Sequence, residues 1–328
     1  MKNYKFRLIV SLLFTVILLI GCKQIDLQHQ VLPIKKSISI ATNQKVESKS
    51  IRILSFNVLC PCWAHPSYYP ESTAPLLNRV LRRQVIIDLL KSYQSTVDAF
   101  TLQEVAQTEF NFFNDALKQN YQGFQANHSP NYWSSWVTND PPWELNGNAI
   151  FIRKDRFANI TFENFPASTS GNHAALFSGT IRNSNGKSIR IASVHLDSDY
   201  PYNRKDELNA VLNTWVTQEN TVDIIAGDFN TETDATNIKT DIQRVGYIDV
   251  LQTLGVESQT HPWDSKYNGA DNWGIIDHII SRNSTPINGK VIDFNLYQLF
   301  PNDEESRINR FLQLSGSDHF PITGSVSY

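Results

Sequence analysis

This chain has few cysteines, a small net charge and no internal repeats, and each of these features excludes a class of protein. The 328 residues include three cysteines and one methionine, and 29 basic residues stand against 32 acidic ones. So few cysteines exclude a small fold stapled by disulfides. The near balance of charge excludes a global electrostatic attraction for nucleic acid, although not a local basic patch. No repeat, low-complexity block or Pro/Gly-rich linker divides the chain, which favours one large domain over two.

The chain begins with the pattern of a secretory leader. Three basic residues precede a largely apolar run, Leu8 to Ile20, and the sequence LIGC ends at Cys22. The run is too short to span a bilayer comfortably and has the form of a signal peptide. Its ending resembles a bacterial lipobox, which predicts removal of residues 1–21 and attachment of lipid to Cys22. An uncleaved N-terminal anchor is the alternative, and either would hold an exported protein at a membrane surface.

The rest of the chain is interpreted as a tether followed by one domain. Residues 22–50 are polar and lack periodicity, whereas residues 51–328 have an ordinary apolar content. Without residues 1–21, 26 basic residues face 32 acidic ones, a formal charge of −6. Cys60 and Cys62 are too close in sequence for an ordinary disulfide and form a poor zinc signature, so two unbonded, partly buried thiols are expected. Arg82 and Arg83 are expected on a solvated helix face.

The order of apolar patterns predicts an α/β protein. Alternating or continuous apolar runs predict strands, and runs with helical spacing predict helices between some of them. Runs of strands interrupt the strand–helix alternation, which favours two packed sheets with helices outside over a doubly wound parallel sheet. The predicted strands are 51–59, 97–102, 147–152, 160–165, 175–181, 188–196, 222–226, 275–281, 290–297 and 321–326, and the predicted helices are 76–93, 108–119, 203–218 and 235–245.

Polar groups of chemical interest follow the predicted strands. Hard cations such as Mg²⁺ prefer carboxylate oxygen, so Glu104 is the best metal candidate, with Asn57 and Asp318 beside it. Histidine is a poor Mg²⁺ ligand but, when charged, a good donor to phosphate oxygen. The complete set is Asn57, Glu104, His195, Asp228 with Asn230, Asp277 with His278, and Asp318 with His319.

The remaining members of this set receive roles in metal-assisted attack on a phosphate ester. His195 and His319 are assigned to the phosphate. Asp228 would orient or deprotonate the attacking water and Asn230 would fix its geometry, while Asp277 would hold His319 in one tautomer. Taken singly, each residue has a plainer interpretation as a turn residue, a helix cap or a core histidine. Of Asp277 and His278, which face opposite sides of one strand, Asp277 is chosen for the site.

Seven segments in order resemble the endonuclease/exonuclease/phosphatase superfamily: SFN-V, LQEV, G-N-AIF, SVHL, GDFN, IDHI and SDHFP. The resemblance covers about residues 51–328. It implies a four-layer α/β/β/α sandwich and phosphoester hydrolysis that depends on Mg²⁺ or Mn²⁺. It also implies a metal ligand at Glu104, assisted by Asn57 and Asp318. The catalytic residues that it implies are His195, Asp228, Asn230, Asp277 and His319. Asn148, in G-N-A, is a further candidate for contact with substrate phosphate. All these motif residues are present, so an active enzyme is expected.

The substrate stays open among several phosphoesters. The segments NVLCPCWA, TLQEV and AIFIRKDRF resemble the deadenylase and nocturnin branch, whereas THPWDSKYN is similar to a stretch of sphingomyelinases. Trp133, Trp136, Trp143, Trp263 and Trp273 would suit base stacking or membrane insertion equally well. We expect an exported, lipid-anchored phosphodiesterase of the cell envelope, acting on nucleic acid or phospholipid. The alternatives are a phosphomonoesterase and a surface binding protein that keeps the fold without catalysis. No protein partner is inferred.

Overall fold

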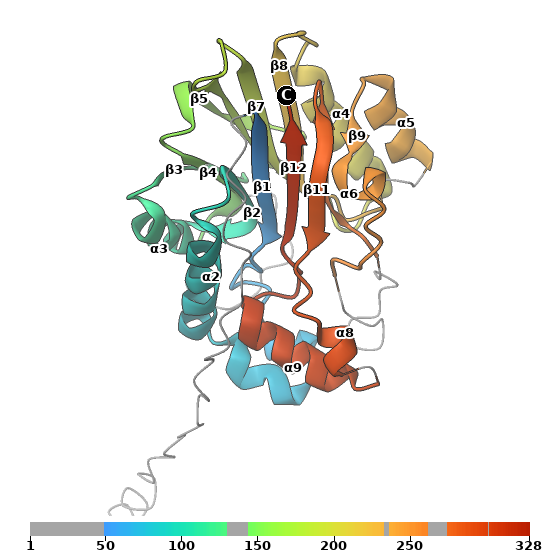
Figure 1. Ribbon diagram of the computed structural model, residues 1–328. Coiled ribbons are helices and arrows are strands. Elements are labelled where there is room, and N and C mark those ends of the chain that lie inside the picture. Colours follow the sequence, from blue (N-terminus) through green and yellow to red (C-terminus); the bar gives the residue numbers. More distant parts are fainter. Residues whose placement is uncertain (1–48, 130–143, 233–235, 262–273, 301) are drawn as a thin grey trace, which may run out of the picture. The chain divides into compact units, whose positions relative to one another are not determined.

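The computed structural model describes residues 49–129, 144–232, 236–261, 274–300 and 302–328. Figure 1 shows the helices and strands of these residues as ribbons. Cys22 and the five tryptophans considered above, Trp133, Trp136, Trp143, Trp263 and Trp273, lie outside the described residues. In the described part of the chain, none of the helices combines the length and apolar character that a membrane span requires.

The strands form two mixed sheets of six strands each. The first runs β11 (Thr285–Val291), β12 (Ile322–Ser327), β1 (Ser50–Asn57), β2 (Ala99–Ala106), β4 (Asn146–Arg153) and β3 (Tyr121–Asn127). The second runs β5 (Phe157–Pro166), β6 (His173–Ile181), β7 (Ser188–His195), β8 (Thr221–Asp228), β10 (Asp277–Arg282) and β9 (Ile248–Asp249). The pairs β1–β2 and β7–β8 are parallel, and the other paired strands are antiparallel.

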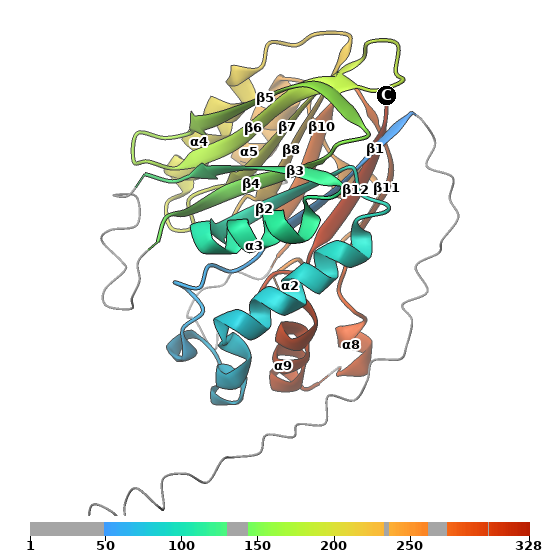
Figure 2. The same ribbon diagram turned by 90° about the vertical axis from the view of Figure 1, so that its left-hand side faces the viewer.

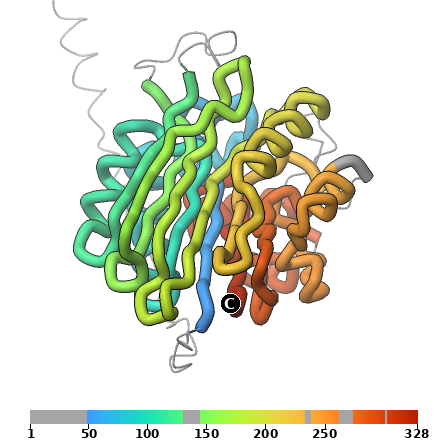
Figure 3. Tube along the Cα trace, turned by 90° about the horizontal axis from the view of Figure 1, so that it is seen from above, coloured from blue at the N-terminus to red at the C-terminus, as the bar shows by residue number. Residues whose placement is uncertain are grey.

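Helices cover the outer face of each sheet. Helices α2 (Arg79–Tyr93) and α3 (Gln107–Leu117) pack against the first sheet, around Phe100 and Phe151. Helices α4 (Pro201–Thr214) and α5 (Thr236–Arg244) pack against the second, around Ile225 and Ile280. The four layers are visible in Figures 2 and 3. The predicted α/β/β/α sandwich is therefore confirmed.

The main core lies between the two sheets, and side-chain alternation decides which residues enter it. In β1, Ile51 and Ile53 belong to the inter-sheet cluster, whereas Leu54 and Phe56 pack under the helices. The two-residue period therefore turns Asn57 toward the space between the sheets. The inward rows of β7 and β8 likewise pass from apolar residues to His195 and Asp228 at their last positions.

Several elements differ from the sequence prediction. Strand β3 and helix α9 (Glu304–Ser315) were not predicted. The strand predicted over 290–297 was wrong, because β11 ends at Val291 and the short helix α8 covers Leu296–Leu299. The other short elements are η1 (Pro66–Tyr68), η2 (Glu71–Leu77) and α6 (Val250–Thr253). Helix α9 packs against η2 and α2, and Figure 1 shows it below the strands of the first sheet.

Two expectations for residues near the end of β1 were also wrong. Cys60 and Cys62 are joined by a disulfide, and their Cα atoms lie 5.1 Å apart, inside the usual range for a bridge. Arg82 is 3% exposed rather than solvated. Arg83 binds Glu109, with Nε 2.5 Å from Oε2. Helical periodicity placed both arginines on a polar face but could not reveal that polar partners cover this face.

Candidate active site

Three site residues stand in one row across the second sheet. The register pairs His195 of β7 with Asp228 of β8, and Asp228 with Asp277 of β10. All three are at most 7% exposed. Gly227 makes the close approach of β7 and β8 possible, because a Cβ there would lie 1.9 Å from the carbonyl oxygen of Val194. The glycine of GDFN is thus a packing requirement of the row.

His319 joins this row from the loop before β12. Its Nδ1 lies 2.8 Å from Asp277 Oδ2, and its Nε2 lies 3.6 Å from Asp228 Oδ2. Burial alone would lower the pKa of His319, but Asp277 and Asp228 raise it well above its ordinary value. The imidazolium form is therefore stabilised, and it presents a proton on Nε2. The expected contact between Asp277 and His319 is present, whereas His278 points away and binds Asp249.

Asp228 sits at the centre of the cluster. Burial would raise its pKa, yet His319 and His195 bring the pKa of this carboxyl below its ordinary value. His195 Nε2 lies 3.6 Å from Asp228 Oδ2, and the Asn230 backbone N–H donates to Oδ1 at 2.8 Å. Asn230 itself has φ 51° and donates its side-chain amide to the carbonyl of Leu196. Asp228 is thus an ionised carboxylate held in a fixed orientation.

Asn57 links the two sheets. Its Nδ2 donates to Glu104 Oε1 at 3.0 Å and to Asp228 Oδ2 at 3.1 Å. The other oxygen of Glu104, Oε2, accepts the Cys60 backbone N–H at 2.7 Å. Glu104 is thereby fixed beside the row, with its Oε1 4.0 Å from His195 Nε2.

A β-bulge aims Glu104 at this point. The register between β2 and β4 shifts between Leu102 and Val105, and Glu104 has φ 58°, a value that non-glycine residues seldom adopt. Bulges commonly redirect a side chain next to an active site. Backbone strain of this kind persists where the surrounding contacts over-determine it, here the two hydrogen bonds to the carboxylate.

Asp318 and Asn148 occupy different surroundings. Asp318 Oδ2 accepts the hydroxyl proton of Tyr69 at 3.0 Å. The preceding Ser317 donates its hydroxyl to the carbonyl of Asn57, which ties this loop to the end of β1.

Asn148 is fully buried and donates its amide to the carbonyl of His173 at 2.7 Å. Its Oδ1 has no hydrogen-bond partner among the described residues.

The cluster suits a divalent cation. Asp228, Asp277 and His319 offer ligand atoms within 4.8 Å of one another, close enough to share an ion. In this arrangement, however, the Nδ1 of His319 is already engaged by Asp277. Glu104 and Asp318 add two further carboxylates, and carboxylate oxygen is the ligand that Mg²⁺ and Mn²⁺ prefer. The residues present therefore fit such an ion.

Thr260 and Tyr69 also contact residues of the site, although the sequence did not predict them. Thr260 accepts the backbone N–H groups of Ile276 and Asp277 through its hydroxyl, at 3.0 Å each. Tyr69 comes from an irregular loop whose sequence has no period to show which side chain turns inward. A threonine or tyrosine in such a loop carries no distinguishing signal in one sequence.

Residues 54–319 match the model of the Endonuclease/Exonuclease/phosphatase family. The curated relatives include the CCR4-Not complex 3'-5'-exoribonuclease subunit Ccr4 of Aspergillus niger, 27% identical over 118 residues. That alignment covers 36% of this chain and 17% of the fungal protein, so the match spans a small part of the relative.

Solved structures share the fold. TDP2 of D. rerio, complexed with single strand DNA product, is 20% identical, covers 85% of this chain and 99% of that one, and has a TM-score of 0.54. The human Nocturnin catalytic domain with bound sulfate anion is 18% identical, covers 85% and 94%, and has a TM-score of 0.56. At these identities the likeness concerns the fold alone.

Proposed function

The chain belongs to the endonuclease/exonuclease/phosphatase family and is a phosphoester hydrolase, and we propose that it cleaves phosphodiesters of nucleic acid with Mg²⁺ or Mn²⁺. The observation that carries the proposal is the linked set Glu104–Asn57–Asp228–His319–Asp277, which joins both sheets through hydrogen bonds and close charges. It combines an ionised carboxylate, a protonated imidazole and a separate carboxylate for a cation. These are the parts that in-line attack of water on a phosphoester needs.

Glu104 would hold the cation, with Asn57 and Asp318 beside it. A divalent ion bound there supplies a Lewis acid for the phosphate oxygens and offsets the negative charge that develops in the transition state. Asn57 already orients Glu104 through its amide, so this carboxylate needs no rearrangement to accept an ion. The preorganised donor set is what makes such stabilisation effective.

Asp228 would orient the attacking water and accept its proton, because it is ionised and central to the row. Asn230 fixes Asp228 through its backbone N–H. His319 holds a proton on Nε2 that faces Asp228 and the incoming phosphate, and Asp277 keeps that proton in place by binding Nδ1. His195, 3.6 Å from Asp228, would contact the phosphate, and so would Asn148, whose Oδ1 has no hydrogen-bond partner among the described residues.

The choice of nucleic acid rests on the relatives. The Ccr4 proteins are named as exoribonucleases and the TDP2 structure holds a DNA product, which supports polynucleotide diesters over monoesters. Phospholipid is the second candidate, because the lipobox-like LIGC at Cys22 would anchor the chain at a membrane. We propose the same cell-envelope location for either substrate, with residues 1–21 as leader and 22–50 as tether.

The test compares diester with monoester. The purified protein is incubated with bis-p-nitrophenyl phosphate or p-nitrophenyl phosphate in Mg²⁺, Mn²⁺ or EDTA, alongside the variants His319→Ala and Glu163→Gln, the latter altering an exposed residue of β5. The proposal expects metal-dependent diester cleavage that is lost in His319→Ala alone. Release from the monoester only would replace it with a phosphatase.

Substrate and location need separate measurements. Oligonucleotide cleavage should weaken steeply as salt rises, because counterions compete for the phosphates, whereas sphingomyelin cleavage should not. Faster turnover of sphingomyelin than of oligonucleotides would favour the phospholipid enzyme. For the anchor, palmitate labelling of cells should mark the protein and be lost in Cys22→Ser. Equal labelling of that variant would contradict lipidation at Cys22.

A further inference from the structure

A group of helices next to the site supplies none of the proposed catalytic residues or metal ligands. We call η1, η2 and α9 together the helical cap. A small apolar cluster of Leu77, Ile308 and Leu312 joins η2 to α9, and the ring of Tyr69 packs against it. The cap has its own hydrophobic contacts, so its construction does not require the site. Two polar connections join it to the loop that carries Asp318, beside an apolar contact between Phe311 of α9 and Phe320.

The first connection is the hydroxyl of Tyr69. It donates to Asp318 Oδ2 at 3.0 Å, from a ring held in the apolar cluster. A phenol keeps its proton at neutral pH, so Tyr69 is the donor in this contact. A carboxylate that accepts a fixed donor through one oxygen loses its freedom to rotate about the last side-chain bond.

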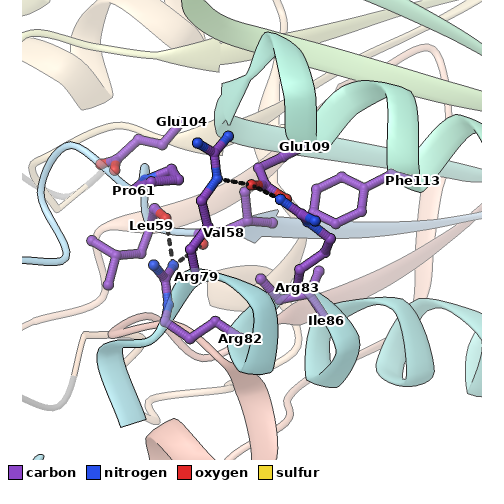
Figure 4. A pocket seen from close by; sticks show the side chains of 10 residues that line it. All are labelled: Val58, Leu59, Pro61, Arg79, Arg82, Arg83, Ile86, Glu104, Glu109 and Phe113. Carbon is purple, nitrogen blue, oxygen red and sulfur yellow. Dashed lines mark hydrogen bonds and ion pairs between the residues drawn. The ribbon is translucent and has the colours of Figure 1, made fainter. Parts of the chain in front are cut away.

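The second connection runs through Arg82 of α2, which bonds Gly316, at the end of α9, to the two residues that follow β1. Its Nη2 donates to the carbonyls of Val58 and Leu59, and its Nε donates to the carbonyl of Gly316 at 2.7 Å. Figure 4 shows Arg82 turned toward Val58 and Leu59, while Arg79 and Arg83 meet Glu109. The acceptors of Arg82 are thus main-chain oxygens on either side of the proposed ligands.

The turn after α9 requires a glycine at position 316. Gly316 ends α9 with φ 72°, and a Cβ there would lie 2.8 Å from the carbonyl oxygen of Arg82. Ser315 then binds the backbone of Ser317 through its hydroxyl, accepting from its N–H and donating to its carbonyl. Hydrogen bonds therefore fix the backbone between the last turn of α9 and Asp318.

We propose that Tyr69 and Arg82 are positioning residues for Asp318, through which the helical cap sets the affinity of the site for its divalent cation. This inference rests on the proposed function, in which Asp318 assists Glu104. Outer partners of metal ligands fix ligand orientation, and their loss commonly weakens metal affinity by about 10- to 100-fold. Arg82 also places a buried positive charge near Glu104 and Asp318, which limits the repulsion between the two carboxylates before an ion binds.

The test removes one oxygen atom. Mn²⁺ binding to the full chain is measured by titration calorimetry for the unaltered protein and for Tyr69→Phe, without substrate. We expect Mn²⁺ affinity to fall roughly tenfold in Tyr69→Phe. The Mg²⁺ concentration for half-maximal diester cleavage should rise by the same factor, whereas kcat at saturating Mg²⁺ should change less. Arg82→Lys, which keeps the charge but loses the planar donor pattern, should shift metal affinity in the same direction.

The matched control is Tyr121→Phe. Its hydroxyl is also buried and donates to the carbonyls of Gln94 and Val97, at the far end of the first sheet from Asn57. This control should lower the melting temperature and leave Mn²⁺ affinity unchanged. A loss of stability without a change in affinity in Tyr69→Phe as well would make its role purely structural and overturn the inference.

Asp318→Ala distinguishes a failure of the positioning role from a failure of the proposed function. If Asp318→Ala weakens Mn²⁺ binding but Tyr69→Phe and Arg82→Lys do not, the positioning role is wrong and the proposed function stands. If Asp318→Ala binds Mn²⁺ as tightly as the unaltered protein, the proposed role of Asp318 itself is wrong. Tyr69→Phe added to Asp318→Ala should cause no further loss of affinity, and an additive loss would also refute action through Asp318.

Discussion

Replacing Asp277 by asparagine tests the proposed role of the His319 proton. The substitution keeps the shape of the side chain but removes the charge that lies 2.8 Å from His319 Nδ1. A buried hydrogen bond to a charged group contributes about 1.5–3 kcal/mol. If this stabilisation is realised in the transition state, kcat should fall roughly tenfold to a hundredfold, because each 1.4 kcal/mol is about tenfold.

The pH dependence of the same variant has a definite sign. Asp277 is among the groups that raise the pKa of His319, so Asp277→Asn should lower that pKa. His319 is then protonated only at lower pH, and the alkaline limb of the kcat profile should move toward acid. The assay is diester hydrolysis at saturating Mg²⁺ across the pH range in which the protein stays folded.

Strand β10 supplies a matched control on its other face. His278 Nδ1 lies 2.8 Å from Asp249 Oδ2, the same buried histidine–aspartate contact outside the row of site residues. Asp249→Asn should lower the melting temperature as Asp277→Asn does, yet leave kcat and its alkaline limb close to those of the unaltered protein. If both variants change kcat alike, or if Asp277→Asn changes only stability, the assignment of His319 as the proton-holding group is refuted.

Three further outcomes follow from the same structure. Gly227→Ala should prevent folding, because its Cβ would lie 1.9 Å from the Val194 carbonyl oxygen. Gly186→Ala, which has nothing within 4 Å, should lower the free energy of unfolding by only about 1–2 kcal/mol because of its positive φ. The yield of soluble protein and urea unfolding check this pair. Asp223→Asn should destabilise the protein by about 3–5 kcal/mol in urea unfolding, because it leaves the buried Arg282 without its anion, and unchanged stability would contradict that ion pair. Addition of EDTA should abolish diester cleavage and lower the melting temperature, since an ion that binds only the folded state stabilises it, and a melting temperature indifferent to metal would count against a resident cation.

Strand periodicity explains why much of the site was visible in the sequence. Asn57, His195 and Asp228 continue the inward alternation of their strands, so an apolar strand pattern already predicts the face on which they stand. The same rule separates Asp277 from His278 on β10. The two-sheet architecture followed from the order of strands and helices, because runs of strands without intervening helices favour antiparallel pairing.

Other features depend on tertiary contacts that the periodicity of apolar residues does not predict. Glu104 reaches Asn57 through a β-bulge, which interrupts the alternation on which the prediction relied. Arg82 lies on a polar helix face that becomes buried only when the loops after β1 and α9 fold over it. Helix α9 carries Ile308, Phe311 and Leu312 at helical spacing, a signal present in the sequence but overlooked. Its neighbour Tyr69 had no comparable signal.

The most direct test of the central claim is a Mg²⁺ titration of bis-p-nitrophenyl phosphate hydrolysis by the unaltered protein, Glu104→Gln and Glu163→Gln. Glu104 is fixed by Asn57 and the Cys60 backbone, whereas Glu163 is an exposed residue of β5. We expect saturable, Mg²⁺-dependent cleavage in the unaltered protein and Glu163→Gln, and its loss in Glu104→Gln. Cleavage that persists at the same rate in Glu104→Gln, with the same Mg²⁺ dependence, would contradict a cation site at Glu104 and with it the proposed active centre.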